Sequence, residues 1–155
     1  MQVLLSIKPQ YVDEIVKGRK KYEFRKKVFK KKTDVREIYI YATSPVKKIV
    51  GYFKSDKIIE DHPEKLWEQY KDHSGIGECE FFEYFKERDV GFAIEISQLE
   101  IFDRPLDPKN IMPNFVAPQS FRYIDHPSIN EGQTTDLLAE KERLTKQVDE
   151  LQKEV

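Results

Sequence analysis

A glycine at position 18 opens the segment that most constrains the fold of this chain, residues 18–25. Glycine adopts the left-handed backbone without strain and is therefore a common residue at the end of a helix. Beyond it, aromatic and charged side chains alternate with the period of two that is typical of a β-strand. Glu23 and Arg25 consequently share one face of this strand, while the two aromatic residues anchor the other face in an apolar core.

The apolar runs of the chain predict an α+β fold. The first strand, at residues 3–8, leads into a helix that begins at Pro9, because proline is favoured in the first turn of a helix. Because neighbouring strands are joined by short turns, we expect a mostly antiparallel sheet that curls into a small β-barrel flanked by helices. Gly51 lies inside one strand, where it indicates a bulge or a close backbone approach. The further strands are predicted at residues 20–29, 35–42, 48–59, 91–102 and 119–124.

An acidic insertion at residues 60–89 interrupts the strands. Pro63 begins a helix with apolar residues at helical spacing, and a second helix follows at residues 78–86. The glycines at 75 and 77 break the helical pattern between them, and no lysine and hydroxyl residue follow as in a phosphate-binding loop. We expect the aromatic residues of the insertion to lie in a core. The position of the insertion in the chain makes it a candidate lid over a binding cleft.

Three regions follow one another along the chain. Residues 1–129 form the predicted domain, residues 130–135 a polar linker, and residues 136–155 a C-terminal helical tail. Leucines recur every seven residues in this tail, which is the repeat of a short coiled coil. The helix either packs on its own domain or joins two copies of the chain in a homodimer.

Basic residues are concentrated near the N-terminus. Residues 17–36 contain eleven Lys and Arg against two acidic residues, although the whole chain has a net charge of −1. A local positive field of this kind attracts polyanions. The single cysteine, Cys79, excludes an internal disulfide, and the sequence has no apolar run of membrane-spanning length. These features predict a soluble, cytoplasmic protein without a membrane partner.

Residues 18–25 resemble the GxKxxExR signature of the ASCH domain (activating signal cointegrator homology), a branch of the PUA-like superfamily. The runs at residues 8–9, 39–45 and 118–121 also resemble this family, and the likeness extends from residue 1 to residue 125. The resemblance implies a PUA-like fold, in which helices flank a small β-barrel, and a cleft that binds RNA or another nucleic acid. Some members of the family instead hydrolyse an amide on a modified nucleoside.

The charges of the motif suit contact with a polynucleotide. Arg25 offers a planar fork for a phosphate or a base edge, Lys20 offers a point charge, and Glu23 can orient either of them. The lysines that follow would track the backbone, so that binding weakens with salt. We therefore favour a nucleic-acid-binding domain, with RNA as the preferred partner and a role in RNA processing or in regulation such as transcription regulation. The candidate binding residues are Lys8, Lys20, Glu23, Arg25, Tyr41, Ser44, Gln119 and Ser120.

The position of Lys20 is an open question in this interpretation. Strict alternation puts its side chain on the face opposite Glu23 and Arg25. The three side chains converge if Lys20 still belongs to the turn that follows Gly18. A plainer alternative is that Glu23 and Arg25 form an ordinary pair in solvent, where such a pair contributes about 0–1 kcal/mol.

Two other functions stay open. The first is an amidohydrolase acting on a modified nucleoside, with Lys20 and Glu23 as catalytic residues; in the hydrolytic relatives the resemblance implies a threonine at the position of Glu23. The second is an oligomeric adaptor that acts through the C-terminal helix. We predict no cofactor and no metal site, because His62, His73 and Cys79 are irregularly spaced for zinc and lack a fourth ligand nearby.

Overall fold

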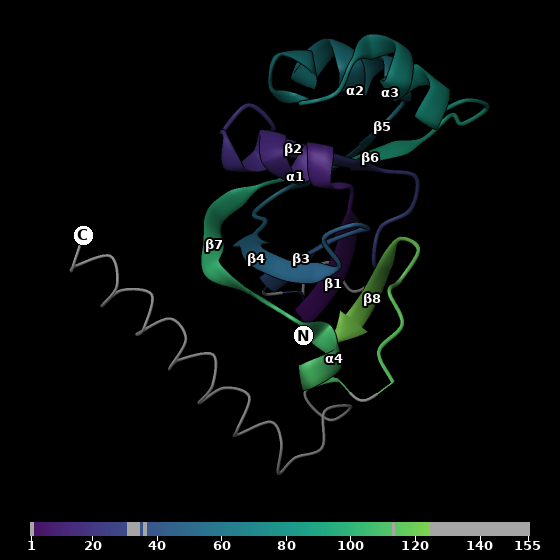
Figure 1. Cartoon of the computed structure of the whole chain (residues 1–155). Coiled ribbons are helices and arrows are strands. Elements are labelled where there is room, and N and C mark those ends of the chain that lie inside the picture. Colours follow the sequence, from purple (N-terminus) through teal and green to yellow (C-terminus); the bar gives the residue numbers. More distant parts are fainter. Residues whose placement is uncertain (1, 31–34, 36, 113, 125–155) are drawn as a thin grey trace.

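The structure of the protein, a computed structural model, describes residues 2–30, 35, 37–112 and 114–124. Within these residues the chain forms strands with short helices inserted between some of them (Figure 1). The strands are β1 (Gln2–Ile7), β2 (Tyr22–Arg25), β3 (Glu37–Ala42), β4 (Lys48–Lys54), β5 (Ile58–Asp61), β6 (Gly91–Glu95), β7 (Ser97–Leu106) and β8 (Phe121–Ile124). The helices are α1 (Pro9–Val16), α2 (Pro63–Tyr70), the 3-10 helix η1 (Lys71–His73), α3 (Glu78–Tyr84) and α4 (Pro108–Ile111).

The strands form two sheets. The larger sheet has the order β7-β4-β3-β1-β8, and the smaller sheet has the order β2-β6-β5. Strand β1 runs parallel to β3, and the other neighbouring pairs in both sheets are antiparallel. The prediction of an α+β fold with mostly antiparallel strands is therefore confirmed.

The prediction of a closed barrel is wrong. Two predicted strands are each split, because the chain leaves one sheet and enters the other at residues 55–57 and again at Ile96. The predicted strand at 20–29 is also shorter, since it begins at Tyr22 and ends at Arg25, where the backbone bends. No ladder of backbone hydrogen bonds joins the two sheets within the described residues. Strand β2 belongs to the smaller sheet, and it contacts β1 through a side chain, that of Arg25, which donates to a carbonyl of β1.

The largest apolar cluster joins the two sheets. Alternate residues of β1 and β3 point to the same side of the larger sheet, as the period of two requires. Helix α1 covers them with Val12 and Ile15, and Ile94 of the smaller sheet packs against the same cluster. The residues buried in this cluster are Val3, Leu5, Ile7, Val12, Ile15, Phe29, Ile38, Ile40, Ala42, Phe53 and Ile94.

The insertion forms a separate layer. Helices α2 and α3 pack on the face of the smaller sheet that points away from β3 and β4, and they lie at the top of Figure 1, at the opposite end from α4. Phe24 and Ala93 contribute the sheet side of this contact, and Leu66, Phe81 and Phe85 the helical side. Phe81 and Phe85 are thus core residues, as predicted, and Trp67 and Phe82 pack partly buried against them. A third cluster, which includes Leu4, Tyr41 and Met112, covers the outer face of the larger sheet.

The C-terminal predictions fall on residues that the structure does not describe. The linker at 130–135 and the heptad helix at 136–155 both lie outside the described residues, and so does the proposed homodimer contact. None of the helices in the described ranges has the length and apolar character needed to cross a membrane.

Gly51 is a point of close backbone approach, as predicted. The register between β4 and β7 shifts next to it, between Ile49 and Gly51. A Cβ atom at position 51 would lie 2.2 Å from the carbonyl oxygen of Glu100 and 3.0 Å from the Cα atom of Ile101. Because both contacts are with backbone, the neighbouring strand would have to move to admit a side chain.

We predict that Gly51→Ser lowers the free energy of unfolding by about 1–3 kcal/mol, the usual cost of overpacking a core. The matched control is Gly77→Ser, since a Cβ atom at position 77 meets no atom within 4 Å. Serine is also a favourable residue at this helix N-cap, so the control should stay within about 0.5 kcal/mol of the parent. Urea unfolding followed by circular dichroism measures both values. Equal stability of the two variants would contradict the close approach.

Candidate nucleic-acid interface

Helix α1 ends where the sequence motif begins. Gly18 has a positive φ of 78°, and its N–H donates to the carbonyl of Ile15 at 3.1 Å. The N–H of Lys20 then donates back to the carbonyl of Glu14 at 3.0 Å. Lys20 therefore belongs to the turn after the helix, and β2 starts two residues later, at Tyr22. This placement answers the question that strict alternation left open.

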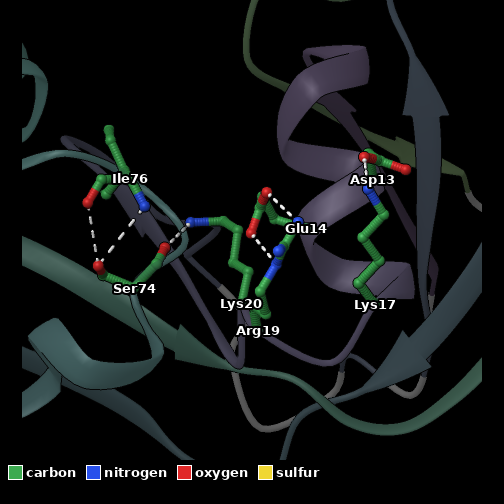
Figure 2. Close-up of polar contacts among 7 residues, drawn as sticks. All are labelled: Asp13, Glu14, Lys17, Arg19, Lys20, Ser74 and Ile76. Atoms are coloured by element: carbon green, nitrogen blue, oxygen red, sulfur yellow. Dashed lines mark hydrogen bonds and ion pairs between the residues drawn. The ribbon is translucent and has the colours of Figure 1, made fainter.

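The side chain of Lys20 is buried, with an exposed fraction of 3%. Its Nζ atom donates to the carbonyl oxygen of Ser74 at 2.7 Å, as Figure 2 shows. The ammonium also lies 5.0 Å from the ring centroid of Phe24 and 5.5 Å from that of Tyr11. A Cβ atom on Gly75, which has a positive φ, would lie 2.5 Å from the Cβ atom of Lys20. The turn at Ser74 and Gly75 in the insertion thus packs closely around the side chain of this lysine.

Burial changes the protonation of this amine. Loss of solvent lowers the pKa of Lys20 below its ordinary value, the negative charge of Glu23 raises it in part, and the positive charge of Arg25 lowers it again. The motif therefore brings Lys20 close enough to both residues for their charges to act on it, although its hydrogen bond goes to the insertion.

The basic neighbours of Lys20 differ from it, as Figure 2 also shows. Lys17 pairs with Asp13 at 2.7 Å, and both side chains are more than half exposed. Arg19 pairs with Glu14 at 2.8 Å, and its side chain is more than half exposed as well. Exposed pairs of this kind contribute about 0–1 kcal/mol each. Little free energy would therefore be lost if these two pairs broke so that Lys17 and Arg19 could contact a polyanion.

Glu23 and Arg25 form a buried pair, so the alternative of a pair in solvent is wrong. Their exposed fractions are 6% and 9%, and the Nε atom of Arg25 lies 3.6 Å from the Oε1 atom of Glu23. In the described part of the chain, the second carboxylate oxygen, Oε2, and the Nε atom have no hydrogen-bond partner. A buried polar atom without a partner is costly, so such atoms in a native fold call for an explanation.

Arg25 also connects the two sheets. Its Nη2 atom donates to the carbonyl oxygen of Ser6 in β1. Its Nη1 atom lies 3.5 Å from the hydroxyl of Ser120, in the segment before β8. The N–H of Ser6 donates to the carbonyl of Ser120, and the hydroxyl of Ser6 donates to the carbonyl of Pro118. The guanidinium therefore ends in a small polar cluster at the end of β1.

The other predicted site residues do not join this cluster. Lys8, Ser44 and Gln119 are exposed, and none of them has a hydrogen bond or ion pair to the motif. Tyr41 is 5% exposed and packs against Phe115 on the outer face of the larger sheet, although it stands opposite Ser6 in the register of β1 and β3. Of the eight predicted residues, the structure thus brings together Lys20, Glu23, Arg25 and Ser120.

Several neighbours of the motif are missing from the sequence interpretation. The hydroxyl of Tyr11, in α1, donates to the Oε2 atom of Glu80 at 2.7 Å. Burial and this hydrogen bond raise the pKa of Tyr11 to about 12. The hydroxyl of Tyr84 accepts a hydrogen bond from the N–H of Lys26 at 3.2 Å. These bonds join the insertion to α1 and to the residue that follows the motif, and the position of the insertion in the chain was the one sequence signal for them.

Metal ligands are not grouped in the part of the chain that the structure describes: no three His, Cys, Asp or Glu residues lie close enough to hold an ion. His62 acts instead as the N-cap of α2, where its Nδ1 atom accepts from the N–H of Glu64 at 3.2 Å. Cys79 is exposed. The chemistry available at the motif is therefore that of an amine, a carboxylate and a guanidinium.

Comparisons with known proteins place this arrangement in context. The model of the ASCH domain family matches residues 5–100, more than half of the chain. A curated ASCH domain-containing ribonuclease of Zymomonas mobilis is 29% identical over 131 residues, which cover 79% of this chain and 84% of that protein. The ATP synthase subunit alpha of Ureaplasma parvum is 28% identical over 123 residues, but this chain spans 15% of that protein.

Solved structures share the fold. The ASCH protein of Zymomonas mobilis superimposes with a TM-score of 0.75 at 26% identity, over 89% of this chain and 94% of that chain. A variant of that protein with a serine replaced by alanine gives a TM-score of 0.76 at 26% identity over the same shares. A variant with a tyrosine replaced by phenylalanine gives 0.75 at 25% identity, over 89% of this chain and 96% of that chain.

We predict that Glu23→Gln lowers the pKa of Lys20 further, because it removes the charge that raises this pKa most. A titration of the Lys20 13Cε resonance by NMR measures the change. Glu14→Gln is the matched control, because Glu14 acts on the same amine more weakly. A Lys20 pKa that rises or stays constant in Glu23→Gln would contradict the proximity of the two groups.

A second prediction concerns stability. Between the lowered pKa of Lys20 in the folded state and its ordinary value of 10.5, the unfolded chain binds more protons than the folded chain. The free energy of unfolding therefore gains a contribution that increases with pH across this window. Lys20→Met, which keeps an unbranched side chain one atom shorter and removes the charge, should lose this contribution. Urea midpoints measured for both proteins at several pH values give the difference, and parallel pH curves would contradict the prediction.

Proposed function

The chain belongs to the ASCH domain family, and on this premise we propose that it binds RNA at the exposed basic surface next to the buried residues Lys20, Glu23 and Arg25. One observation carries the proposal. The charged motif is buried, two of its polar atoms have no hydrogen-bond partner among the described residues, and an exposed basic segment lies beside it. The name of the Zymomonas mobilis relative, a ribonuclease, supports RNA as the class of ligand. We propose a role in RNA processing or in regulation on the same basis.

Exposed basic side chains supply the phosphate contacts. Lys21, Lys27 and Lys30 are exposed on both sides of the buried motif residues. Lysine binds phosphate as a point charge, and each contact releases counterions from the nucleic acid. The exposed residues Lys8, Ser44 and Gln119 are candidates for the rim of the same interface.

We predict that binding of a single-stranded RNA weakens as salt rises, and that replacing Lys27 and Lys30 together by glutamine reduces this dependence. Each lost phosphate contact lowers the slope of log K against log salt by about 0.7 for a single strand. Fluorescence anisotropy with a labelled ten-nucleotide RNA at several salt concentrations measures the slope. The matched control replaces two exposed lysines on other elements, Lys54 and Lys109, by glutamine and should leave the slope unchanged.

Two results would count against the proposal. If the parent protein binds neither RNA nor DNA at low salt, the proposed function is wrong. If the control and the test variant lose the same slope, the basic segment is not the phosphate-contacting surface.

RNA cleavage is the second candidate function. Two observations favour it: the curated relative is a ribonuclease, and burial lowers the pKa of the Lys20 amine below its ordinary value, so that the amine gives up its proton more readily than an exposed lysine. The solved variants of the Zymomonas mobilis protein each remove a side-chain hydroxyl from that protein. The amidohydrolase alternative gains no comparable support, because Glu23 carries no hydroxyl.

We predict that, if this second function holds, the parent protein shortens a labelled single-stranded RNA and Lys20→Met does so at least about a hundredfold more slowly, as expected for loss of a general acid or base. Gel electrophoresis of timed samples measures the rates. Lys54→Met is the control, since this lysine is exposed at the end of β4. Equal cleavage by parent and Lys20→Met would remove Lys20 from the chemistry.

A further inference from the structure

The two buried atoms of the motif that have no hydrogen-bond partner need partners of opposite type. The Oε2 atom of Glu23 is an acceptor, the Nε atom of Arg25 is a donor, and neither has a partner among the described residues. The two residues stand on the same face of β2, and their nearest charged atoms are 3.6 Å apart. A ligand that satisfies both atoms must therefore present one donor and one acceptor side by side.

Neighbouring protein groups are already engaged elsewhere. The terminal nitrogens of Arg25 face the carbonyl of Ser6 and the hydroxyl of Ser120. The Lys20 ammonium donates to Ser74, in the insertion. Neither contact satisfies the free atoms of the pair, so the requirement for a donor at Glu23 remains.

A phosphate group does not meet this requirement. A phosphodiester carries acceptors and no donor, so it could bind Arg25 but would leave the Glu23 oxygen unpaired. The buried carboxylate would also repel it, since like charges placed together at an interface oppose binding. The edge of a nucleobase, in contrast, places an N–H donor next to an oxygen or nitrogen acceptor, and it is free to bind when the base is unpaired.

An aromatic side chain contacts the residue that follows the pair. Tyr84 is 36% exposed, and its hydroxyl accepts from the N–H of Lys26, the residue after Arg25. The Lys26 ammonium lies 4.7 Å from the centroid of this ring. A base that stacks on Tyr84 would displace the ammonium and leave it free to meet a phosphate. Stacking on aromatic side chains is how proteins commonly hold single-stranded bases.

We propose that Glu23 and Arg25 read the edge of one unpaired RNA base, which inserts beside Tyr84 while the phosphates stay outside on the exposed lysines. This inference rests on the proposed RNA binding and adds what the buried pair recognises. It assigns Glu23 the role of accepting a hydrogen bond from the base, and it makes the site selective for single strands.

The first test uses the parent protein alone. The affinities of eight-nucleotide homopolymers of A, C, G and U are measured by fluorescence anisotropy, and the tightest is then scanned with one abasic residue at each position. One position should weaken binding about tenfold or more, because removing the base leaves buried charged groups without partners. A complementary strand should abolish the tight binding. In a second scan with single 2′-deoxy residues, no position should weaken binding about tenfold.

The second test removes the negative charge of Glu23 and measures whether RNA binding becomes weaker or tighter. Glu23→Gln keeps the shape of the side chain and removes its negative charge. It should weaken binding of the same RNA about tenfold. In this variant, an abasic residue at the sensitive position should reduce the affinity by a smaller factor than in the parent protein. Were a phosphate bound there, removal of the repelling charge would tighten binding instead. The control is Glu14→Gln in α1, a half-buried carboxylate that pairs with Arg19, and circular dichroism melting checks that both variants fold.

The outcomes separate the inference from the function beneath it. If no oligonucleotide binds the parent protein, the proposed RNA function and this inference both fall. If RNA binds but the abasic scan is flat, or Glu23→Gln binds more tightly, the inference alone is overturned and RNA binding stands. If a single 2′-deoxy residue weakens binding as strongly as the abasic residue was expected to, the pair recognises the sugar and the assignment to the base is wrong.

Discussion

The structure depends on how three charges are accommodated away from water. Burying a charged group is unfavourable unless partners replace its hydration. Lys20 is held by a carbonyl of the insertion and by two aromatic rings, and Arg25 is held by β1 and the segment before β8. The same contacts that stabilise the charges therefore tie α1, the insertion and both sheets together. A change to the motif is consequently a change to the architecture as well as to the surface.

Much of the fold follows from local sequence signals. Pro9 begins a helix and Gly18 ends it, Gly51 lies where two backbones approach, and the glycine-flanked break at 75–77 separates two helices. The division into two sheets could not be predicted in this way. At residues 55–57 and at Ile96 the chain changes sheet, yet the apolar pattern on both sides keeps the same period of two. Periodicity describes which face a residue points to and contains no information on which sheet it belongs to.

The candidate site shows a similar limit. The pairing of Glu23 with Arg25 was predictable, because two residues on one face of a strand are neighbours whatever the rest of the fold. The burial of Lys20 was not, since its partner Ser74 is 54 residues away in the chain. Tyr41 was assigned to the site from the sequence, but its ring packs against Phe115 on the outer face of the larger sheet. Long-range packing decided each of these cases.

The turn at Ser74 and Gly75 has a consequence for how proteins with this motif diverge. It supplies the carbonyl that holds the Lys20 ammonium, and its glycine leaves room for the lysine stem. This turn belongs to a loop outside the eight motif residues, so its length and composition can vary while the motif stays constant. Two homologues with identical signatures can then carry amines of different basicity and reactivity. Inheritance of the signature would preserve the framework, and the facing loop would set the chemistry.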